Sequence, residues 1–188
     1  MKNNSKRLIS LLALSLIALS VFIVWSISES EASYEKPQEA LLAENEDLVL
    51  IPAYITQDEA LFFFIRNETN LGAAMVYKNL WGWKSDFLTW SSFNSITTGE
   101  KIGGYQIHGD KVIFGLIEEG DKRVVMLNNT PAPAIPLELS LPDEMDNDHL
   151  SDLSLWYFET DELANESSLT LVERSTNEEI DTLHIPPY

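Results

Sequence analysis

An acidic segment over residues 142–149 carries carboxylates at a spacing that resembles a metal-binding loop. Glu144, Asp146 and Asp148 alternate as the first ligands of a calcium loop do. The sixth position, which needs glycine for a sharp turn, is His149, and the twelfth, where a bidentate glutamate belongs, is Leu155. The segment therefore predicts a solvated connection without a metal or cofactor, with a looser calcium site as the alternative.

Three tryptophans within ten residues form a second candidate site. Trp81, Trp83 and Trp90 lie among polar residues, and exposed indole faces in such surroundings can grip sugar rings. Trp81 and Trp83 would share a face if the segment were extended. A cysteine-free β domain also uses tryptophan to fill its core, and we expect most of the surface of these three side chains to be buried there. Glycan binding is the alternative.

The three histidines predict neither a metal site nor a catalytic base. His108 lies in an expected turn, His149 in the acidic segment and His184 in an expected strand. No two of them have the spacing of metal ligands on one element. The sequence also lacks the glycine-flanked serine that would supply a nucleophile on a sharp turn. We therefore expect a protein without catalytic activity.

The elements that must position these residues begin with an apolar segment. Three basic residues precede a mostly apolar run over residues 8–27, and the first acidic residue is Glu29. A run of this length spans a hydrocarbon layer of about 30 Å as a helix, and the charge bias places the N-terminus inside and the remainder outside. Residues 1–28 are thus predicted to anchor the chain in the plasma membrane. Signal-peptide cleavage after Ala32, which would give a secreted protein, is the alternative.

Charge and cysteine content limit what the exported part can be. It holds all 30 acidic residues and 9 of the 12 basic ones, a net charge of −21. Such a charge disfavours nucleic acid and other anionic polymers or headgroups, which leaves a basic protein, a cationic surface or solvent as its surroundings. Without cysteine the fold cannot use disulfides. A single domain of about 160 residues is large enough to rest on its core.

Beyond the anchor the sequence predicts a short connection and an all-β domain. Residues 29–47 are expected to form an acidic tether and a short helix that begins at Pro37. From residue 48 to 188 β-branched and aromatic runs alternate with Gly, Asn, Asp and Pro. Residues 62–65 and 112–117 are apolar on both faces and are expected at the centre of the fold. We expect one antiparallel domain, either a sandwich or a small curved barrel.

The turn residues set the expected strand boundaries. Gly120 and Asp121 predict a two-residue hairpin turn, and the alternation over residues 137–141 predicts a strand with one face in water. The expected strands are 48–55, 61–66, 72–78, 84–90, 104–107, 112–118, 123–127, 137–141, 153–159, 169–174 and 180–185.

The order of several short motifs resembles a family of small single-pass or exported proteins of spore-forming Gram-positive bacteria that has no assigned function. The motifs are EDLVLIP (46–52), ALFFFI (60–65), NLG (70–72), WGWK (81–84) with LTW (88–90), IHG (107–109), RVVM (123–126), LWYFE (155–159) and IDT (180–182). The resemblance covers most of the exported part. It implies a bacterial cell-envelope setting and brings no activity or site residues.

The sequence thus predicts a membrane-anchored extracytoplasmic module that binds an unidentified protein or envelope component and catalyses no reaction. An envelope protein that binds or processes glycans through residues 81–90 is the second interpretation, and an envelope hydrolase is the third. Two-layer β folds serve all three roles, so the fold class alone does not decide between them.

Overall fold

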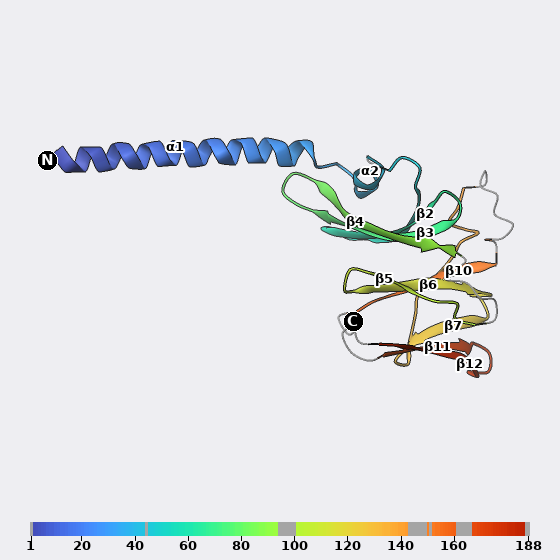
Figure 1. Cartoon of the computed structure of the whole chain (residues 1–188). Coiled ribbons are helices and arrows are strands. Elements are labelled where there is room, and N and C mark those ends of the chain that lie inside the picture. Colours follow the sequence, from blue (N-terminus) through green and yellow to red (C-terminus); the bar gives the residue numbers. More distant parts are fainter. Residues whose placement is uncertain are drawn as a thin grey trace.

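A computed structural model describes residues 2–43, 45–93, 101–142, 150, 152–160 and 167–186, with side chains from residue 11 onward. A long N-terminal helix is followed by a mainly β domain (Figure 1), which confirms the predicted fold class. The helices in this part are α1 (Lys2–Glu31) and α2 (Pro37–Leu42). The strands are β1 (Val49–Ile55), β2 (Glu59–Arg66), β3 (Asn70–Lys78), β4 (Trp83–Ser92), β5 (Gln106–His108), β6 (Val112–Glu118), β7 (Arg123–Leu127), β8 (Thr130–Pro131), β9 (Ala134–Pro136), β10 (Leu153–Glu159), β11 (Ser167–Glu173) and β12 (Glu179–Ile185).

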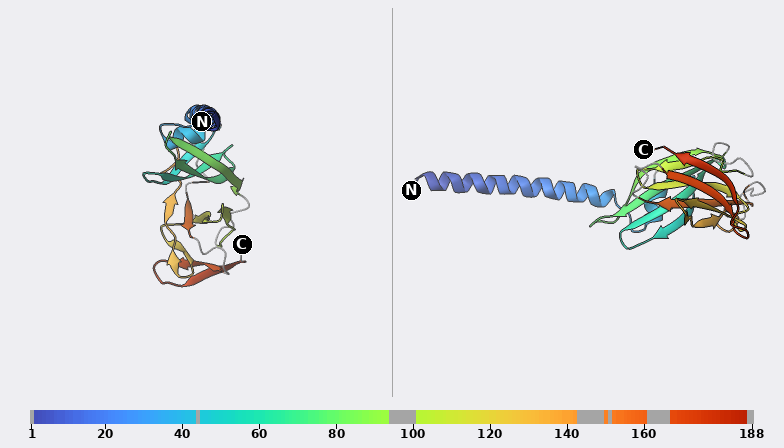
Figure 2. Two further views of the ribbon diagram at one scale, coloured as in Figure 1. Left: turned by 90° about the vertical axis from the view of Figure 1, so that its left-hand side faces the viewer. Right: turned by 90° about the horizontal axis from the view of Figure 1, so that it is seen from below.

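Helix α1 is the one helix among the described residues that is long and apolar enough to cross a membrane. Its described apolar side chains are exposed, and it projects away from the β domain (Figure 2). The helix continues to Glu31, beyond the predicted end of the anchor. Tyr34 then pairs with Trp83, so the acidic segment predicted as a tether ahead of Pro37 contacts the β domain.

The strands form three antiparallel sheets of four strands each. Their orders are β1-β2-β3-β4, β5-β6-β10-β9 and β12-β11-β7-β8. The three sheets are stacked in this sequence, and α2 covers the outer face of the first sheet (Figure 1). Where the sequence left a sandwich and a barrel open, the fold is a stack with one sheet more than a two-layer sandwich.

The two central strands of the first sheet, β2 and β3, are buried on both faces. Phe63 points toward the second sheet, where its ring centroid lies 5.1 Å from that of Phe114. Phe62 and Phe64 point the other way and belong to the cluster that contains Leu41 of α2. Because both faces are covered, this part of β2 carries apolar residues at successive positions instead of alternating with polar ones.

The second sheet lies in the middle of the stack. Phe114 and Leu116 of β6 face the first sheet, whereas Ile113 and Ile117 face the third. Trp156 on the adjacent β10 is fully buried against the third sheet. The prediction that this doubly apolar run is central is therefore confirmed.

The predicted hairpin between β6 and β7 is wrong. β6 pairs with β5 and β10, and β7 pairs with β8 and β11, so residues 119–122 cross from the second sheet to the third. Glu119 adopts a φ of 52°, and its carbonyl accepts the N–H of Lys122 at 2.8 Å. Gly120 is required for space, because a Cβ there would lie 2.4 Å from the Cβ of Ser154 on β10.

The predicted strand over residues 137–141 is also wrong. After β9 the chain forms one helical turn, in which the N–H of Leu141 donates to the carbonyl of Leu137 at 3.2 Å. Leu137 and Leu141 are buried, but Leu139 is 82% exposed. Leucines at every second position fit a strand, and two of them four residues apart fit a helical turn equally well. Packing of this pair against the first and second sheets selects the turn.

Alanine substitutions at Leu137 and Leu139 distinguish the turn from the strand. Leu137→Ala leaves a cavity in the core and should lower the free energy of unfolding by about 2–5 kcal/mol. Leu139→Ala removes an exposed side chain and should change it by less than about 0.5 kcal/mol. Denaturant unfolding of the full-length chain in mild detergent, followed by tryptophan fluorescence, measures both. Equal losses for the two variants would favour the strand.

Candidate functional site

The three tryptophans of the predicted sugar site lie in three different surroundings. Trp83 is 5% exposed and packs in the core between the first sheet and α2. Trp81 precedes β4, is partly buried and packs against α1. Trp90 is 48% exposed, and the Arg66 guanidinium carbon lies 4.9 Å from its ring centroid. Burial in the core is thus confirmed for Trp83 and wrong for Trp90, and the three indoles do not share one platform.

A tight turn from Asn79 to Gly82 joins β3 to β4 and presents Trp81. The Oδ1 atom of Asn79 accepts the backbone N–H groups of Trp81 and Gly82 at 2.8 and 3.0 Å. Gly82 has a φ of 144°, and a Cβ there would lie 2.5 Å from the carbonyl oxygen of Tyr34. Asparagine and glycine therefore let the turn close while the chain that leaves α1 passes against it.

The end of α1 docks on this turn, and we name the contact the helix–hairpin junction. The rings of Trp25 and Trp81 meet edge to face with centroids 4.8 Å apart, and Trp81 Nε1 donates to Ser26 Oγ at 3.0 Å. Lys84 Nζ lies 2.9 Å from Glu29 Oε2. The backbones of the following segment and of β4 exchange two hydrogen bonds of 2.9 and 2.8 Å. The junction consists of Trp25, Ser26, Glu29, Tyr34, Trp81, Trp83 and Lys84.

These contacts fix the direction in which α1 leaves the domain. An aromatic pair contributes about 0.5–1.5 kcal/mol, and a hydrogen bond contributes a similar amount. The ion pair between Lys84 and Glu29 is partly exposed and adds less than about 1 kcal/mol. Because only five residues separate Glu31 from Pro37, little chain entropy opposes the docking.

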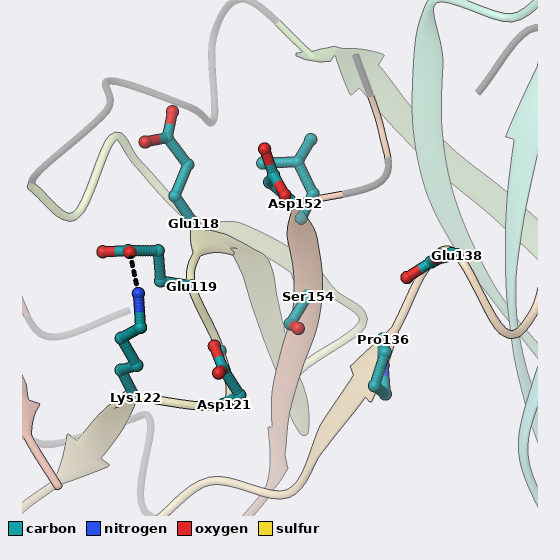
Figure 3. A pocket seen from close by; sticks show the side chains of 10 residues that line it. Glu118, Glu119, Asp121, Lys122, Pro136, Glu138, Asp152 and Ser154 are labelled. Carbon is teal, nitrogen blue, oxygen red and sulfur yellow. Dashed lines mark hydrogen bonds and ion pairs between the residues drawn. The ribbon is translucent and has the colours of Figure 1, made fainter. Parts of the chain in front are cut away.

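An open acidic cleft of about 720 Å³ forms a second candidate site (Figure 3). It lies between the link from β6 to β7, the start of β10 and the turn after β9. Five carboxylates line it, and Figure 3 shows them spread around the cleft instead of converging on one point. These are the side chains of Glu118, Glu119, Asp121, Glu138 and Asp152.

Basic side chains neutralise one of the five carboxylates. Glu119 forms salt bridges with Lys122 and, at 2.9 Å, with Arg123. The hydrogen bond from Lys122 and the neighbouring positive charges lower the pKa of the Glu119 carboxyl below its ordinary value. Within the described part of the chain, no salt bridge reaches the other four carboxylates. The cleft can therefore complement cationic groups, such as lysine or arginine side chains, on a partner.

A small cavity of about 140 Å³ lies where β4 meets β5 and β6, with His108 in its wall. His108 is 2% exposed, and its Nδ1 lies 2.9 Å from the Thr89 hydroxyl. Its ring centroid is 4.7 Å from that of Phe87. Burial lowers the pKa of His108 and favours the neutral imidazole. These contacts account for the burial of His108 as packing between the first and second sheets.

The calcium candidates Glu144, Asp146 and Asp148 lie outside the described residues, as does His149. Among the residues that are described, no group of three or more His, Asp or Glu side chains is arranged to hold a metal ion. His184 is exposed on β12 and lies apart from the buried His108 of β5 in the sheet order.

The helix–hairpin junction was not predicted from the sequence. The available signal was a pair of matched spacings, with an acidic residue four positions after Trp25 and a basic residue three positions after Trp81. Each spacing places an aromatic ring and a charge near each other. Which of the other four tryptophans meets Trp25 depends on how β3 and β4 fold back, and the spacing does not specify that.

No family model, no curated protein and no solved structure matches this chain. The resemblance to proteins of spore-forming Gram-positive bacteria therefore stays a prediction. The function is inferred from the geometry of the junction and the cleft.

Trp83→Ala and Trp90→Ala should have different effects. Trp83→Ala should lower the free energy of unfolding by about 3–5 kcal/mol, whereas Trp90→Ala should lower it by less than about 1 kcal/mol because it mainly loses the contact with Arg66. Denaturant midpoints measure stability, and retention on peptidoglycan or soluble oligosaccharides measures glycan binding. We expect retention to be the same for both variants and the wild type. A Trp90→Ala protein of unchanged stability that loses glycan affinity would instead support the glycan-binding interpretation.

Proposed function

We propose that this chain is a single-pass membrane protein that holds an acidic β domain outside the plasma membrane as a non-catalytic interaction module. The observation that carries the proposal is the helix–hairpin junction, in which Trp81 and Lys84 of the domain contact the end of the apolar helix. A signal peptide is cleaved off after export, so it would not need contacts with the folded domain.

The position of the contacts favours retention of α1 over its cleavage. All three α1 residues of the junction precede Ala32. Cleavage after Ala32 would remove the ring partner and the hydrogen-bond acceptor of Trp81, and it would leave Lys84 without its carboxylate partner. The three basic residues ahead of the apolar run favour a cytoplasmic N-terminus and an external domain.

The charge of the domain favours a cationic partner. The part beyond the apolar run has a net charge of −21, and four carboxylates of the acidic cleft have no salt bridge among the described residues. Such a surface attracts basic proteins or cationic envelope components and repels nucleic acid. The burial of His108 between Thr89 and Phe87 supports a structural role for this histidine over a catalytic one.

A glycan-binding role is the second candidate, and one observation favours it. Trp90 is 48% exposed beside Arg66, so part of its indole is accessible to a sugar ring. One exposed indole supports glycan binding less than the contacts of the whole junction support a membrane-anchored interaction module.

The full-length chain should stay in the membrane fraction of a bacterial host with its N-terminus intact. The double variant Leu16→Arg/Val21→Arg provides the control, because each charge at the centre of a spanning helix costs about 2.5–3.5 kcal/mol and membrane retention should fall. Fractionation and amino-terminal sequencing measure both proteins. A soluble wild-type species that begins at Ser33 would contradict the anchor and leave export standing.

A short oligolysine peptide should bind the full-length protein in detergent, with an affinity that falls as salt is added. The double variant Glu118→Gln/Asp152→Asn should weaken binding about tenfold, because losing two ion pairs of about 0.7 kcal/mol each gives that ratio. The matched control Asp58→Asn/Glu178→Gln removes the same charge from exposed positions outside the cleft and should weaken binding less than about twofold. Equal weakening by both would contradict the cleft as the partner site.

A further inference from the structure

The most exposed large apolar side chain of the described residues lies at the tip of the turn between β3 and β4. Leu80 is 93% exposed, compared with 82% for Leu139. The hydrogen bonds to Asn79 Oδ1 hold the turn, so the exposure belongs to a fixed conformation. A single exposed leucine is ordinary on a protein surface. Leu80 differs from such residues because its turn lies against α1.

The junction sets the level of Leu80 along α1. Its neighbour Trp81 contacts Trp25 and Ser26, which directly precede Ile27, the last residue of the apolar run. In a helix that spans a bilayer, aromatic residues near the end of the apolar run lie where hydrocarbon gives way to headgroups. Figures 1 and 2 both show the turn lying beside the last turns of α1 and reaching back along the helix. Leu80 is thus held at the level of the outer interface when α1 spans the membrane.

The residues around Leu80 have the chemistry of a membrane interface. Trp25 and Trp81 place two indoles at this level, and tryptophan is enriched in that layer. Lys78 and Lys84 flank the turn, although the exported part is strongly acidic. Lys84 is held by Glu29, so Lys78 is the one of the two that can lie along apolar surface and extend its ammonium group to lipid headgroups.

We propose that the turn over residues 79–82 is a second membrane contact, which inserts Leu80 into the outer interface of the bilayer beside α1. This inference rests on the proposed function, because α1 must span the membrane. The junction fixes the domain relative to α1, but α1 alone could still tilt and rotate in the bilayer together with the domain, whereas a second contact limits both motions. Apolar insertion requires no anionic lipid, so a zwitterionic bilayer is sufficient despite the acidic domain.

The lack of cysteine in the sequence permits a test with single labels. Leu80→Cys, Leu139→Cys and Val21→Cys, each in the full-length chain, are labelled with a nitroxide and reconstituted in phosphatidylcholine vesicles. Paramagnetic resonance compares collisions of each label with oxygen, which concentrates in lipid, and with a nickel chelate, which stays in water. The ratio of oxygen to nickel accessibility should be severalfold higher at Leu80 than at Leu139 and highest at Val21.

The three labels separate the two proposals. Leu139 is the matched control, since like Leu80 it is a highly exposed leucine, but it lies away from α1 and the junction. A Leu80 ratio equal to that of Leu139, with a high ratio at Val21, would overturn the membrane contact and leave the anchor intact. A low ratio at Val21 would overturn both. Near-UV circular dichroism of the unlabelled variants shows whether each retains the wild-type fold, as expected for positions with exposed side chains.

Discussion

Burial of β6 on both faces is the constraint on which the other layers depend. Phe114 and Leu116 require one apolar surface, and Ile113 and Ile117 require another on the opposite side. The first and third sheets supply these two surfaces. With no cysteine in the sequence to cross-link the layers, their stability rests on this apolar packing, at about 25 cal/mol per Å² of buried apolar surface.

Each further layer must also have its apolar outer face covered, unless that face is polar enough to contact water. Phe62 and Phe64 emerge on the far side of the first sheet, and α2 covers them with Leu41. At the other edge, β12 is mostly exposed or half-buried, so the stack ends there without another layer. Because the side chain of Trp83 packs in the cluster under α2 and its backbone pairs with Tyr34, the cover of the first sheet and the docking of α1 share one residue. The path of α1 is therefore coupled to the core and is not set by a flexible link.

The sequence predicts the features that depend on local pattern. Its predictions are wrong where contacts between distant segments determine the structure. The boundaries of β6 and β10 were predicted at the observed residues, since apolar runs bounded by turn residues leave little choice. Residues 137–141 satisfy two periods at once, and only contact with the core selects the helical turn. The Gly120 turn has hairpin chemistry, yet β6 and β7 belong to different sheets, because β5 and β10 pair with the two edges of β6 and leave β7 no edge of that strand to join. From local pattern alone, Trp81 could be assigned to the core or to a sugar-binding platform. Its ring partner is Trp25, which lies 56 positions earlier in the sequence.

The direction of the strands separates the charges of the domain. β6 begins at Val112, which lines a cavity together with Phe87 in the first half of β4, and runs for seven residues to Glu118 at the acidic cleft. At about 3.3 Å per residue this places the cleft roughly 20 Å farther from the start of β4, more than twice the Debye length of about 8 Å at physiological salt. Lys84 lies at the junction, and the four cleft carboxylates that have no salt bridge among the described residues lie at the other end. With α1 in a membrane, a cationic partner would meet the cleft carboxylates at a distance where headgroup charges are screened, so binding to the lipid surface and binding to the cleft need not compete.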